Sequence, residues 1–117
     1  MKLSAIAKKV LCQGTDDWVP MAEVASLARD VLHDASSTTV RQASLGAIQE
    51  LQSNGYVRVG DVTRTGFVPW AQSPQESLER IEREWVALGV PRLGDIGWLE
   101  NTALGREIGL DVAKRSR

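Results

Sequence analysis

Residues 36–59, SSTTVRQASLGAIQELQSNGYVRV, contain the signals of a helix that runs directly into a strand. Hydroxyl side chains at 36–38 favour a helix start, because a serine or threonine oxygen accepts a hydrogen bond from a free first-turn amide. Asn54 and Gly55 favour a left-handed helix stop, and residues 56–59 have the composition of a strand. The stretch therefore predicts a helix over about 37–54 followed at once by a strand.

The predicted 37–54 helix has an apolar face and a polar face. At about 100° per residue, the apolar side is formed by Val40, Ala43, Ala47, Ile48 and Leu51. Gln42, Gln49 and Ser53 fall opposite, and Arg41 and Leu45 lie toward the boundary. We expect the apolar side to pack on the rest of the protein and the polar side to stay at the surface.

Two shorter helices are predicted before this stretch. Apolar residues recur at helical spacing over 3–11, which indicates a first helix. Pro20 suits a first helical turn because its missing N–H is not needed there, so a second helix is predicted over MAEVASLARDVL, ending near His33. Trp18 and Val19 lie between the two and predict a very short strand.

A further helix is predicted over about 73–89, well after the strand at 56–59. Ser73, Pro74 and Glu76 make a capping-box start, in which the serine and glutamate side chains bond each other's backbone amides.

The carboxyl-terminal part of the chain predicts a returning strand and a last helix. Ile96, Trp98 and Leu99 have the pattern of the strand, and Thr102 is a suitable cap for the helix that follows. The predicted fold class is α+β: mainly α, with a small antiparallel sheet. With 117 residues the whole chain, 1–117, is expected to form one domain.

The composition is that of an ordinary globular chain, with 43% hydrophobic and 25% charged residues. No apolar run approaches the roughly 20 residues that span a bilayer, so we expect a cytoplasmic protein without membrane contact.

The order of helix, short strand, helix, helix, strand, strand and helix resembles the winged helix-turn-helix domain of bacterial transcription regulators. TTVRQA, followed by an apolar-faced helix and then GYVRV, is similar to a recognition helix running into the first wing strand. WLENTALGRE resembles the second wing strand passing into a closing helix. The resemblance implies DNA binding through the 37–54 helix and the wing, and the formation of dimers through added helices.

The chain departs from this family pattern in two places. Val40 and Gly55 lie one helical turn further apart than the resemblance implies, so the recognition helix is expected to be longer. The predicted 73–89 helix is an insert between the two wing strands. It would change how the wing reaches into the DNA groove, or it would provide a surface for a protein partner.

Five residues are candidates for DNA contact: Thr38, Arg41, Gln42, Arg58 and Arg64. Outward residues near the start of a helix in the major groove reach base edges, where arginine pairs with guanine and glutamine with adenine. The two later arginines could touch phosphate from the strand and wing. The alternative interpretation is a solvated polar face.

The overall charge does not favour a nucleic-acid binder that works by bulk attraction. Net charge is −1 and the sequence pI is about 5.8. Both ends of the chain are basic, however, and the acidic residues concentrate between them at 16–34 and 76–84. A DNA-binding face must avoid these two acidic segments.

The 73–89 helix has a narrow apolar stripe formed by Leu78, Ile81, Trp85 and Leu88. The stripe is either an internal core face or an interface between two copies of the chain, since two heptads are too few for a self-sufficient coiled coil. Both alternatives stay open, and the resemblance favours a homodimer in which this helix takes part.

Catalytic chemistry is not expected. The sequence has one cysteine, Cys12, and one histidine, His33, which excludes the usual metal-ligand clusters. No serine–histidine–aspartate set or glycine-rich phosphate loop is recognisable, so we predict no catalytic residues, no metal and no cofactor. The leading hypothesis is a transcription regulator that binds duplex DNA; the alternative is a winged-helix module that binds a protein partner and no DNA.

Overall fold

Helix α3, Ser37–Ser53, is the longest helix of the computed structural model, which describes residues 3–92 and 95–115. The Ser36 side chain caps it by accepting a hydrogen bond from the Thr39 amide at 3.1 Å. Gly55 follows with a φ of 71°, a conformation that glycine adopts without steric cost. Both ends of the predicted helix are therefore confirmed to within one residue.

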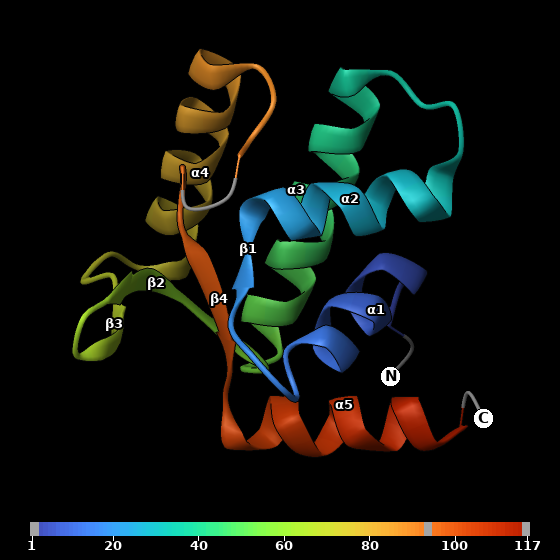
Figure 1. Ribbon diagram of the computed structural model, residues 1–117, viewed down its shortest axis with the longest axis vertical. Helices are drawn as coiled ribbons and strands as arrows, with labels where there is room; N and C mark the ends of the chain where they lie inside the picture. Colours follow the sequence, from blue (N-terminus) through green and yellow to red (C-terminus); the bar gives the residue numbers. More distant parts are fainter. Residues whose placement is uncertain (1–2, 93–94, 116–117) are drawn as a thin grey trace.

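The described residues form five helices and four strands (Figure 1). Besides α3, the helices are α1 (Ala5–Gln13), α2 (Met21–Leu32), α4 (Pro74–Leu88) and α5 (Ala103–Arg115). The strands are β1 (Val19–Pro20), β2 (Val57–Thr63), β3 (Gly66–Pro69) and β4 (Trp98–Asn101). The predicted α+β class is confirmed.

The four strands form one antiparallel sheet in the order β1-β4-β2-β3. Its centre is the pairing of β2 with β4, in which Val59 lies opposite Leu99. The strand predicted after the insert, β4, thus lies between β1 and β2. Strands β2 and β4 are therefore neighbours in the sheet, although β3 and α4 lie between them in the sequence.

Strand β3 was not expected from the sequence. The chain turns back directly after Thr63, and Val62 pairs with Phe67 across a tight hairpin. Gly66 has a φ of 119° and permits the turn. Figure 1 shows this hairpin projecting on the side of the molecule opposite α1.

Helix α3 is the centre of the packing, because α1, α2, α4 and β2 all contact it. Its buried residues include Val40, Ser44, Ile48 and Leu51. Ser44 is compatible with this position because its hydroxyl donates to the Val40 carbonyl at 2.7 Å.

Helix α4 packs antiparallel to α3, as Figure 1 shows. The predicted capping box at Ser73 and Glu76 is present, and the Gln52 side chain of α3 donates to the Pro74 carbonyl at 3.3 Å. In the middle of α4, the guanidinium of Arg80 lies 3.7 Å from the ring centre of Trp70. These contacts fix α4 to the rest of the fold.

The apolar stripe of α4 is used largely inside the chain. Ile81 and Trp85 are buried in the common core, and Leu78 is partly buried against it. Leu88 is 51% exposed. Ile81 and Trp85 are buried within the chain itself, on a helix that packs against α3, so no surface is left there for the predicted interface with a second copy; at Leu88 that interface stays a prediction.

Helix α5 packs closely on the other elements through two glycines. A Cβ atom on Gly105 would collide with the Tyr56 carbonyl, and one on Gly109 would lie 2.6 Å from the Leu11 carbonyl oxygen. These glycines let α5 lie flush against α1 and the segment between α3 and β2.

Replacing Trp85 with alanine is expected to lower the free energy of unfolding by about 3–5 kcal/mol, because the side chain is 2% exposed and its loss opens a cavity. The adjacent Val86 is 57% exposed, so Val86→Ala serves as the control and should change stability by less than about 0.5 kcal/mol. Urea denaturation followed by circular dichroism measures both. Equal effects of the two substitutions would contradict the burial of the stripe.

Candidate nucleic-acid interface

One side of α3 remains exposed along most of its length. Apart from Ser37 and Thr39 in the first turn, the exposed residues of α3 fall on a single ridge, within an arc of about 80° around the helix. The members of this ridge are Thr38, Gln42, Gly46, Gln49 and Ser53. We call this surface the α3 ridge; it extends about 22 Å along the helix axis.

No member of the α3 ridge carries a charge. The helix contains one acidic residue, Glu50, and its carboxylate is held by the start of α1. One oxygen accepts from the Ser4 hydroxyl at 2.8 Å and the other from the Ser4 amide at 3.1 Å. The ridge therefore presents hydroxyl and amide groups, which donate and accept hydrogen bonds without repelling an anionic partner.

Of the DNA-contact candidates in α3, Thr38 and Gln42 lie on the ridge. Arg41 lies on the flank beside it, is only partly exposed, and has an enclosed Nε atom with no hydrogen-bond partner in the described ranges. Gln49 and Ser53 were recognised in the sequence as polar-face residues but not as candidates for contact. The helical spacing that predicted the polar face also places these two residues on the same side as Gln42, and this was the signal that could have added them to the contact candidates.

Arg58 is engaged within the protein. Its guanidinium forms a salt bridge with the Glu100 carboxylate, on the neighbouring strand β4, and lies 5.7 Å from the ring centre of Phe67. The second Glu100 oxygen accepts from Trp18 Nε1 at 2.9 Å. A phosphate contact by Arg58 would therefore compete with an existing carboxylate partner.

The pKa of Glu100 reflects this cluster. Partial burial is the largest influence and raises the pKa, but hydrogen bonds from Arg58 and Trp18, together with the Arg58 charge, outweigh it. The net result is a pKa below the ordinary value of 4.5. The cluster consequently stabilises the ionised carboxylate.

Arg64 lies in the turn between β2 and β3 and is exposed. The neighbouring Thr63 hydroxyl organises the turn by donating to the Gly66 carbonyl at 2.9 Å and accepting from the Thr65 amide at 3.2 Å. The hairpin thus holds one cation at a projecting tip of the sheet (Figure 1).

Helix α4 brings negative charge to the flank of α3. Its outer surface carries four glutamates, Glu76, Glu79, Glu82 and Glu84, and two arginines, Arg80 and Arg83. Arg80 and Glu84 pair at 2.8 Å, which leaves an excess of carboxylates on the rest of the helix. An anionic partner of the α3 ridge must keep clear of this surface.

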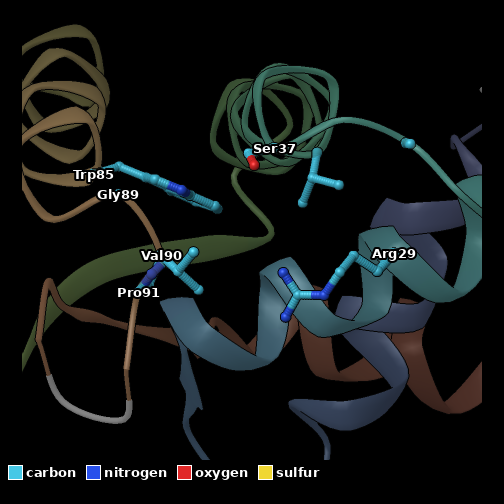
Figure 2. Close-up of a pocket in the computed structure, with 8 residues that line it drawn as sticks. Arg29, Ser37, Trp85, Gly89, Val90 and Pro91 are labelled. Carbon is cyan, nitrogen blue, oxygen red and sulfur yellow. The ribbon is translucent and has the colours of Figure 1, made fainter.

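A small hollow of about 90 Å³ lies at the amino-terminal end of α3. Figure 2 shows the Arg29 side chain extending into it from α2, below Ser37, with Trp85 and Val90 on the facing side. The end of α2, the start of α3 and the end of α4 meet around this hollow. Its volume is below that of an engineered cavity of about 150 Å³ that holds benzene.

The lone cysteine is poorly suited to nucleophilic chemistry. Burial raises the pKa of the Cys12 thiol above its ordinary value of 9.0, and the charge of Lys9 offsets only part of this effect. The Sγ atom lies 3.7 Å from the Gly109 carbonyl oxygen, at the contact of α1 with α5. The position agrees with a packing role for the thiol.

Within residues 3–92 and 95–115, no three histidine, cysteine, aspartate or glutamate side chains gather in a way that could hold a metal ion. In the same residues, no helix has the length and apolar character needed to cross a membrane. Comparisons with protein-family models, curated proteins and solved structures found no match.

Glu100→Gln is expected to reduce stability at neutral pH, with a deficit that shrinks as the solution is acidified. A carboxylate whose folded pKa is lowered stabilises the fold above its unfolded pKa, and this contribution is lost as pH falls through the folded value. Denaturant titrations from neutral pH to about pH 3 measure the difference between variant and wild type. Glu107→Gln, on exposed α5 surface, is the control. A deficit that stays constant across the acid range would contradict this account of the cluster.

Proposed function

We propose that this chain is a winged helix-turn-helix protein that binds duplex DNA, with α3 in the major groove and a role in transcription regulation. The order of elements supports the proposal. Helices α1 to α3 precede β2, the sheet places β4 between β1 and β2, and α5 closes the chain. In this interpretation β2 and β4 are the wing strands, and β3 and α4 are inserted between them.

The observation that carries the proposal is the α3 ridge. Glutamine side chains bond adenine through the major groove with one donor and one acceptor, and hydroxyls bond bases or phosphates. The ridge offers these groups on an exposed helix face without a carboxylate, in a chain with 15 acidic residues. Arg64 on the hairpin supplies a cation for the phosphate backbone.

A second candidate function is binding of a protein partner through the end of α4. Val86, Leu88 and Val90 are 57%, 51% and 57% exposed, and the acidic surface of the same helix disfavours DNA there. A homodimer is one form of such a contact and remains a prediction. This surface and the α3 ridge are different, so one does not exclude the other.

Gln42→Ala should weaken binding to a duplex selected from a randomised pool by about 1–3 kcal/mol, and should relax the preference at one A·T pair, because a bidentate base contact is lost. Arg64→Ala should weaken selected and scrambled duplexes alike and reduce the slope of log K against log salt by about 1, because it removes a phosphate contact. Fluorescence titrations at several salt concentrations measure both effects.

Gln13→Ala, an exposed glutamine of α1, is the matched control and should bind as wild type does. The proposal fails if wild type enriches no duplex from the pool. It also fails if both variants retain the affinity and base preference of wild type, because α3 and the hairpin would then not contact DNA.

A further inference from the structure

Gly46 lies in the middle of α3 and in the middle of the α3 ridge. Glycine inside a helix is unfavourable relative to alanine, because its backbone loses more conformational freedom on folding. A glycine at such a position usually has a local reason, either a positive φ or a neighbour too close for a side chain.

Neither reason applies to Gly46. Its φ is in the ordinary range, and a Cβ built on it would meet no atom within 4 Å. Every other glycine in the described part of the chain has either a positive φ or a close neighbour, as Gly55 and Gly105 illustrate. Gly46 is thus the one described glycine that the fold itself does not require.

We infer that Gly46 is the point at which the α3 backbone approaches duplex DNA most closely, with Gln42 and Gln49 reading base edges on either side of it. The inference rests on the proposed function and adds two residues, Gly46 and Gln49, to the contact surface. A missing side chain at the centre of the ridge lets the helix lie deeper against the bases. The flanking glutamines then reach the bases with their amide groups.

The spacing of the two glutamines predicts the separation of the base pairs that they contact. Gln42 and Gln49 are two helical turns apart, a rise of about 10 Å. Stacked bases rise 3.4 Å per step in each strand, so the two contacts fall about three base pairs apart when the helix follows the groove. The selected duplex should therefore contain two A·T pairs at about that separation. Gln49→Ala should relax the preference at one of them, and Gln42→Ala at the other.

The decisive variants are Gly46→Ala and Gly46→Gln, compared with Ala87→Gln on the outer surface of α4. Because the new Cβ meets open space, Gly46→Ala should raise Tm by about 2–5 °C in the absence of DNA. The same substitution should weaken binding to the selected duplex by about tenfold, and Gly46→Gln should weaken it more. Ala87→Gln should leave the affinity within about twofold of wild type.

Thermal unfolding without DNA and fluorescence titration with the selected duplex measure these effects separately. If wild type selects a duplex and both Gly46 variants bind it as tightly as wild type, this inference is wrong and the proposed function stands. If wild type selects no duplex, the proposed function fails and the inference falls with it. A decrease in Tm for Gly46→Ala would show that the fold requires the glycine and would also overturn the inference.

Sedimentation without DNA tests the alternative occupant of the ridge, a second copy of the chain. A wild-type dimer that Gly46→Gln converts to folded monomer would assign the close approach to a protein contact and contradict the inference. Monomers for both proteins, together with the loss of DNA affinity in the variant, support it.

Discussion

The burial of α3 on every side except one is the constraint on which the rest of the structure depends. Helices α1, α2 and α4 and strand β2 all pack against it, and its apolar residues Val40, Ile48 and Leu51 form the middle of the core. Even its single carboxylate, Glu50, is used to hold the start of α1. On α3 itself, the uncharged ridge is the surface that remains for an external partner.

Helix α4 shows how far an amphipathic pattern predicts structure. The capping box at Ser73 and the stripe containing Ile81 and Trp85 gave the position of α4 and its apolar side, because both signals are local. The pattern could not reveal which surface covers the stripe, since another helix of the same chain and a second copy satisfy it equally. Contact with α3 decided this, and that helix ends at Ser53, well before α4 begins at Pro74.

Other features also escaped prediction. Arg58 looked like an isolated cation because its partner Glu100 is 42 residues away and meets it only when β2 pairs with β4. Strand β3 was missed because it is short and ends at Pro69, a residue that weakens any strand assignment. The helix glycines look alike in the sequence, and only the packing separates them: a Cβ on Gly105 would collide with Tyr56, whereas a Cβ on Gly46 would meet open space.

The most direct test of the central claim, that the α3 ridge is the surface that meets DNA, is a titration of ¹⁵N-labelled protein with duplex followed by amide chemical shifts. If the ridge meets DNA, the largest shift changes fall on the ridge between Thr38 and Ser53 and on the hairpin turn at Arg64. Changes confined to α4 and to Val90, with the ridge amides unmoved at saturating duplex, would contradict it.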